Sequence, residues 1–93
     1  MQKTLVFLLL GTNLGERERN LKRAIDEVSK GDIFSLRQSS VFKSEPWGFE
    51  SKNYFLNQCI SFYTRLNAEE LLLHLKLIEK EMGRKIQVNS GYQ

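Results

Sequence analysis

The sequence is poor in residues that form cross-links and metal centres. It has one cysteine, Cys59, and one histidine, so an internal disulfide and a classical zinc site are both excluded. Low cysteine usage favours a reducing compartment, which makes the cytoplasm the expected location. The longest apolar run, Leu5–Leu10, is far shorter than the roughly 20 residues of a membrane helix. It leads into Gly11 rather than a cleavage site, so no secretory signal is expected.

Length and charge further restrict the kind of protein that this chain can form and the partners that it can bind. The chain has 93 residues, which suits one domain over residues 1–93. Apolar residues make up 41% and charged residues 27%, a balance typical of globular rather than disordered chains. The net charge of +3 comes from basic residues scattered among acidic ones, which indicates a solvated surface. We therefore expect neither nucleic acid nor a membrane as a partner.

Hydrophobic periodicity predicts alternating strands and helices. Leu5–Leu10 is apolar at both parities, which indicates a strand central in its sheet and covered on both faces. The other expected elements are a helix over 16–30, a strand over 33–43, a loop over 44–53, a strand over 55–66 and a helix over 67–83. In the strand 55–66, one parity is mainly apolar (Leu56, Ile60, Phe62, Leu66), and the other carries Asn57, Cys59, Ser61 and Tyr63.

The order β-α-β-β-α predicts an α+β fold, a ferredoxin-like antiparallel sheet with packed helices. In that arrangement a last strand follows the second helix and pairs beside the first strand. Residues 84–93 show no periodicity, so we expect this last strand to be absent. The strand at 5–10 would then be an open apolar edge. We favour an incomplete domain; the alternative is an edge covered by another chain, as in a homodimer.

Two segments carry residues suited to a flat ligand. Pro46 and Trp47 lie in a loop that either presents backbone groups to a ligand or forms a surface corner. The carboxamide of Asn57 offers donors and an acceptor to the edge of a heterocycle, although a polar residue on a half-solvated sheet face would look the same. Phe55, two residues earlier, shares its side of the strand and could stack on such a ring.

Near the end of the second helix, two charged residues have equally open interpretations. Glu79 borders the apolar stripe, as an edge residue or as a buried hydrogen-bond acceptor. Arg84 follows Gly83, where its side chain could bind a phosphate or simply complement the helix dipole.

Four blocks in chain order form a more specific pattern: LGTNLGER at 10–17, SSVFKSEPWG at 39–48, FLN at 55–57 and IEKEMGR at 78–84. In this combination the sequence resembles the 6-hydroxymethyl-7,8-dihydropterin pyrophosphokinase family of folate biosynthesis. The resemblance extends to about Arg84. It implies transfer of pyrophosphate from ATP to the hydroxymethyl oxygen of the pterin, with two Mg²⁺ ions at the nucleotide phosphates.

The resemblance also implies roles for individual residues. The pterin would be bound by Gly11, Ser44, Glu45, Pro46, Trp47, Phe55 and Asn57. The nucleotide would be bound by Lys76, Glu79 and Arg84, and Arg84 would also act in catalysis by stabilising the transferring group.

The chain departs from the family most strongly at its end. The family continues with an Arg-rich loop and an Asp-x-Asp strand whose carboxylates hold both metal ions, whereas residues 85–93 contain no carboxylate. We therefore expect no metal ligand in this chain and little activity from these 93 residues alone. The alternative is a non-catalytic pterin-binding fragment, as a strand-swapped dimer. An RNA-binding domain of the same element order is disfavoured, because residues 55–60 lack the aromatic signature of such domains.

Overall fold

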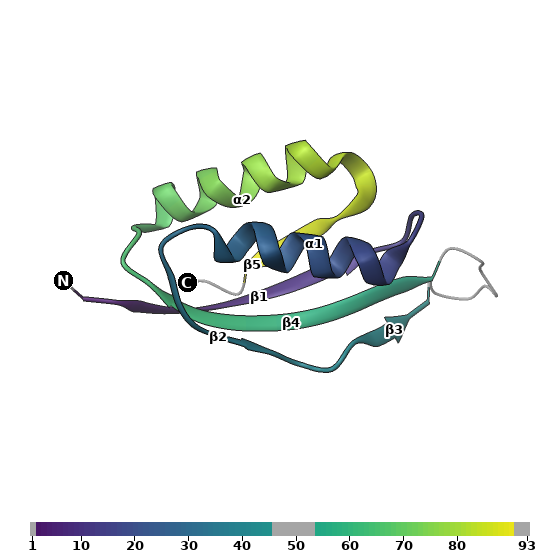
Figure 1. The fold of residues 1–93 in the computed structure, drawn as a ribbon, viewed down its shortest axis with the longest axis horizontal. Coiled ribbons are helices and arrows are strands. Elements are labelled where there is room, and N and C mark those ends of the chain that lie inside the picture. Colours follow the sequence, from purple (N-terminus) through teal and green to yellow (C-terminus); the bar gives the residue numbers. More distant parts are fainter. Residues whose placement is uncertain (1, 46–53, 91–93) are drawn as a thin grey trace.

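The computed structural model describes residues 2–45 and 54–90, and Figure 1 shows two layers, a β-sheet with both helices on one of its faces. The elements in chain order are β1 (Thr4–Thr12), α1 (Arg17–Ser29), β2 (Ile33–Gln38), β3 (Phe42–Ser44), β4 (Phe55–Thr64), α2 (Ala68–Met82), the 3-10 helix η1 (Gly83–Lys85) and β5 (Gln87–Ser90). In the described part of the chain, no helix is long and apolar enough to cross a membrane.

The sheet has the strand order β2-β4-β1-β5, and the short β3 extends it by pairing with β4. All pairings are antiparallel. The longest runs from Thr4 opposite Thr64 to Thr12 opposite Leu56, between β1 and β4. This order confirms the predicted ferredoxin-like arrangement and places β1 in the centre of the sheet.

The expectation that the last strand is absent is wrong. Residues 87–90 form β5, which pairs with β1 from Leu8 opposite Ser90 to Gly11 opposite Gln87. Pairing needs only the backbone groups of the β1 edge, so it does not require a periodic sequence. Two apolar residues still anchor the segment, because Ile86 is 3% exposed and Val88 packs against the core. β5 thus covers the β1 edge from Leu8 to Gly11, the edge on which the alternative of a homodimer depended.

The expectation that β1 is covered on both faces is also wrong. Val6, Leu8 and Leu10 lie under the helices and are at most 2% exposed. The alternate residues, Leu5, Phe7 and Leu9, are 43%, 58% and 37% exposed. An apolar run at both parities indicates two covered faces only where a second layer exists. Both described helices lie on the same face (Figure 1), which leaves the other face open.

The helices form the covered side of the core. Their buried apolar residues are Leu21, Ala24, Ile25 and Val28 in α1 and Leu71, Leu75, Ile78 and Met82 in α2. They pack with Ile60 and Phe62 of β4, which confirms the predicted apolar parity there. The start of α2 is held by a capping box, in which Asn67 and Glu70 exchange side-chain-to-backbone hydrogen bonds of 3.0 and 2.9 Å.

The strand expected over 33–43 is divided. β2 ends at Gln38, and residues 39–41 separate it from β3. The pairing of β2 with β4 shifts register between Phe34 and Arg37, and Ser35 between them has a φ of 55°. Ser44, expected in the loop, is the last residue of β3.

Replacing Ile86 by alanine tests whether the last segment belongs to the core. Ile86 is 3% exposed, so Ile86→Ala should lower the free energy of unfolding by about 2 to 4 kcal/mol in urea titrations. The exposed neighbour Lys85 provides the control, and Lys85→Ala should change it by less than about 0.5 kcal/mol. Equal effects of the two variants would contradict this packing.

Removing the side-chain cap of α2 should lower the free energy of unfolding by less than Ile86→Ala does. Asn67→Ala deletes the acceptor for the Glu70 amide and should cost about 1 kcal/mol of unfolding free energy, measured in the same titrations. Asn67→Ser keeps an acceptor at this position and should retain most of the stability. A loss as large for serine as for alanine would exclude the cap as the cause.

Candidate functional site

Four of the residues expected to bind a pterin meet at one end of the open sheet face. Gly11 in β1 lies opposite Asn57 in β4, and Ser44 in β3 lies opposite Phe55 in β4. Residues paired across antiparallel strands share a face, and so do positions 55 and 57 of one strand. The sheet register therefore brings Gly11, Ser44, Phe55 and Asn57 into one group, which we call the Asn57 cluster.

The carboxamide of Asn57 is held in one orientation. Its Nδ2 donates to the Ser44 hydroxyl at 2.9 Å and to the Phe42 carbonyl at 3.3 Å. Asn57 is 8% exposed, yet no described residue donates a hydrogen bond to its Oδ1. Since no buried side-chain oxygen or nitrogen of the described residues lacks a partner, this Oδ1 is accessible to solvent. The side chain thus presents a fixed acceptor.

Gly11 leaves room beside that acceptor. A Cβ at this position would lie 3.2 Å from Asn57 Oδ1 and 3.5 Å from Cδ1 of Phe55. The first distance is tighter than ordinary van der Waals contact, so any side chain would press on the amide. Glycine therefore lets the β1 backbone approach the amide and the Phe55 ring together.

Of the other residues expected on the pterin side, the structure describes only Glu45. Glu45 follows β3, and its carboxylate forms an ion pair with Lys43 at 3.2 Å, with both side chains about half exposed. Pro46 and Trp47 lie outside the described residues. Their roles, like those of the Asn57 cluster, stay predictions.

The residues expected to bind the nucleotide do not contact the Asn57 cluster in the described part of the chain. Lys76 is exposed on α2, and the half-buried Glu79 accepts a hydrogen bond from the Val88 amide of β5 at 3.3 Å. Arg84 belongs to η1, and its side chain lies outside what the structure describes. Gln87, opposite Gly11, brings the end of η1 to the same end of the sheet as the cluster. Helix α2 lies on one face of the sheet (Figure 1), and strand alternation directs the cluster toward the opposite face.

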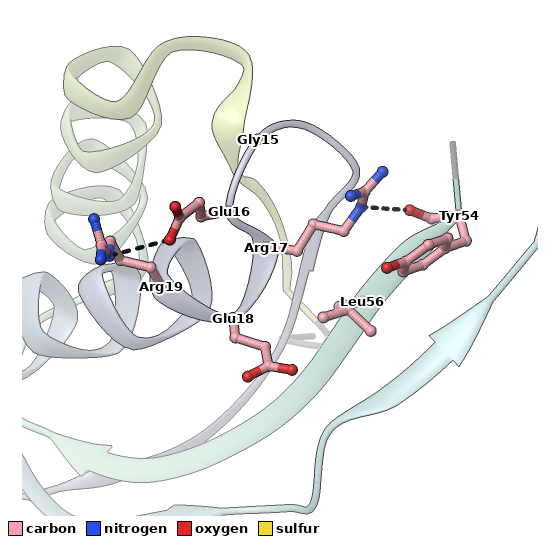
Figure 2. A pocket seen from close by; sticks show the side chains of 7 residues that line it. All are labelled: Gly15, Glu16, Arg17, Glu18, Arg19, Tyr54 and Leu56. Carbon is pink, nitrogen blue, oxygen red and sulfur yellow. Dashed lines mark hydrogen bonds and ion pairs between the residues drawn. The ribbon is translucent and has the colours of Figure 1, made fainter. Parts of the chain in front are cut away.

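Two groups that make hydrogen bonds at this end of the sheet were not predicted from the sequence. The Phe42 carbonyl that accepts from Asn57 is a backbone group, which no side-chain pattern reveals. Arg17 binds the Tyr54 carbonyl at 3.0 Å beside a hollow of about 270 Å³ (Figure 2). The sequence did offer one indication for Arg17. A cation in the first turn of a helix is disfavoured by the helix dipole, so an arginine there indicates a specific contact elsewhere.

The described residues do not form a metal site made of protein side chains alone. Among them, no group of three or more histidine, cysteine, aspartate or glutamate side chains is close enough to hold a metal ion. Mg²⁺ favours carboxylates, phosphates and water. The two ions expected for the complete enzyme stay a prediction.

Known proteins resemble the chain over most of its length. The family model for 7,8-dihydro-6-hydroxymethylpterin-pyrophosphokinase (HPPK) matches residues 7–92. A 2-amino-4-hydroxy-6-hydroxymethyldihydropteridine pyrophosphokinase of Aquifex aeolicus is 40% identical over 92% of this chain and 53% of its own length. That of Porphyromonas gingivalis is 36% identical over 94% of this chain and 59% of its own length. The chain thus spans little more than half the length of these relatives.

A solved structure agrees on the fold. The crystal structure of an HPPK-DHPS protein in complex with substrates superposes with a TM-score of 0.73 at 13% identity, covering 96% of this chain and 27% of that one. Identity this low supports the shared fold alone. The match of the family model to residues 7–92 goes further, and it shows that this chain belongs to the 7,8-dihydro-6-hydroxymethylpterin-pyrophosphokinase family.

Proposed function

We propose that the protein containing this chain transfers pyrophosphate from ATP to 6-hydroxymethyl-7,8-dihydropterin, a step of folate biosynthesis, and that the Asn57 cluster forms one wall of the pterin site. Membership of the family supports the reaction. One observation carries the site: two internal hydrogen bonds donated by Nδ2 hold the Asn57 carboxamide, and its Oδ1 stays accessible beside the Phe55 ring.

The cluster suits a pterin for chemical reasons. A pterin is flat, and its pyrimidine edge carries N–H donors that a fixed carbonyl oxygen can accept. Asn57 is already oriented before a ligand arrives, so binding costs little side-chain entropy. A ring seated against this oxygen would lie over Gly11 with its face toward Phe55, an arrangement favoured by aromatic stacking. This fixes the position from which the hydroxymethyl oxygen can attack.

On the nucleotide side, we propose that Lys76, Glu79 and Arg84 contact ATP. Glu79 accepts a hydrogen bond from the Val88 amide of β5, and Gln87 of the same strand pairs with Gly11. In this proposal, Arg84 supplies a fixed positive charge that stabilises the pyrophosphoryl group during its transfer. We further propose that Ser44, Glu45, Pro46 and Trp47 complete the pterin side. The cytoplasmic location expected from the single cysteine stays a prediction.

Because residues 85–93 contain none of the carboxylates that hold the metal ions in the family, we expect this chain to bind a pterin yet to transfer pyrophosphate poorly by itself. Pterin binding is therefore the property to measure first, by titration calorimetry with 6-hydroxymethylpterin.

Replacing Asn57 by alanine should weaken pterin binding about tenfold or more, because an unpaired polar partner costs about 1 to 3 kcal/mol. Phe55→Ala should weaken it by a similar factor through the loss of stacking. Ser61→Ala is the matched control, since Ser61 lies on the same strand face but opposite Phe7, away from the cluster. Unchanged affinity in both site variants, or no binding by the unaltered chain, would contradict the proposed site.

Gly11→Ala tests the geometry of the same wall without removing a polar group. The added methyl lies 3.2 Å from Asn57 Oδ1 and should displace the amide, with about a tenfold loss of pterin affinity by calorimetry. Gly15→Asn is a suitable control, because nothing lies within 4 Å of a Cβ there and asparagine tolerates the φ of +63°. Wild-type affinity in Gly11→Ala would mean that the ligand does not approach this strand.

A further inference from the structure

The guanidinium of Arg17 joins two segments that are distant in sequence. Its Nε donates to the Tyr54 carbonyl at 3.0 Å, and its Nη2 donates to the Asn13 carbonyl at 3.1 Å. Asn13 lies in the turn after β1, and Tyr54 immediately precedes β4. Figure 2 shows the side chain reaching from the start of α1 to Tyr54. One planar group thus ties the end of β1 to the beginning of β4.

The same contact is reinforced by stacking. The Arg17 guanidinium carbon lies 4.3 Å from the centre of the Tyr54 ring, and Lys43 Nζ lies 4.4 Å from it. Cation–π contacts of this kind contribute about 0.5 to 1 kcal/mol at exposed sites. Lys43 belongs to β3, so the Tyr54 ring also connects β3 to this junction.

The position of Arg17 is otherwise unfavourable. It is the first residue of α1, where the partial positive charge of the helix dipole disfavours a cation by about 0.3 to 1 kcal/mol. Its neighbour Arg19 instead forms an exposed ion pair with Glu16 at 3.5 Å. The two carbonyl hydrogen bonds and the ring contact offset this unfavourable position of Arg17, whereas Arg19 makes no such hydrogen bond to a carbonyl of the described residues.

The bridge lies directly behind the Asn57 cluster. Strand alternation directs Tyr54 and Leu56 toward the Arg17 hollow, and it directs Phe55 and Asn57 toward the open face. Gly11, two residues before Asn13, lies opposite Asn57. Both ends of the bridge are thus within two residues of a member of the cluster.

We propose that Arg17 is a positioning residue that holds the first residues of β4 against the end of β1 and so sets the spacing between Gly11, Phe55 and Asn57. As far as the ligand is concerned, this inference rests on the proposed pterin site. Arg17 does not touch the pterin in this proposal; it acts through the backbone at Asn13 and Tyr54.

Calorimetry with 6-hydroxymethylpterin on the full 93-residue chain tests whether Arg17 affects pterin binding. Arg17→Ala should weaken binding about tenfold. Arg17→Lys should not restore it, because an ammonium group lacks the planar fork that reaches both carbonyls. Arg19→Ala should bind like the unaltered chain. Wild-type affinity in Arg17→Lys would show that charge alone suffices and would overturn the proposal.

A second measurement needs no ligand and separates this inference from the proposed function. The heteronuclear NOE of the Phe55 and Asn57 amides should fall in both Arg17 variants, while that of Phe62, in the buried part of the same strand, should stay unchanged. Unchanged values at Phe55 and Asn57, or an equal fall at Phe62, would overturn the positioning role. If the unaltered chain binds no pterin, the proposed function fails, and the NOE still decides whether Arg17 orders this junction.

Discussion

The antiparallel pairing of β1 with β4 is the constraint on which the rest of the structure depends. It extends from Thr4 opposite Thr64 to Thr12 opposite Leu56. A shift of one residue would turn every side chain of a strand to the other face. In the observed register, Leu8 and Ile60 are buried together under the helices, and the same register sets Gly11 beside Asn57 on the opposite face. Core packing thereby stabilises the geometry of the site.

The two faces of this sheet differ in the residues they carry and in what covers them. The covered face carries the apolar core with both helices, and the open face keeps Phe7 exposed in its centre and the Asn57 cluster at its end. At that end, polar contacts replace hydrophobic packing. The Asn57 amide is held by Ser44 and the Phe42 carbonyl, and Arg17 joins the strand ends from behind. An open face with fixed polar groups can accept a flat ligand without first unpacking a core.

Periodic segments were predictable because one local pattern decided them. The two parities of residues 55–66 appear in the structure, with Phe62 buried and Tyr63 exposed. The prediction failed where the outcome depended on distant partners. β5 forms because the β1 edge offers unpaired backbone groups, which residues 87–90 satisfy. Leu5 and Leu9 are exposed because no described helix lies on their side of the sheet.

Residue identity and the period of a strand were enough to predict the family, the elements from β1 to α2 apart from the break between β2 and β3, and the shared side of Phe55 and Asn57. The folded sheet was needed to show how Gly11 and Ser44 meet these two residues, that the amide of Asn57 is held with its oxygen accessible, and that Arg17 connects the two strand ends. Each of these facts is a distance between segments far apart in the chain. Sheet register sets such distances, and register is a property of the whole packed sheet.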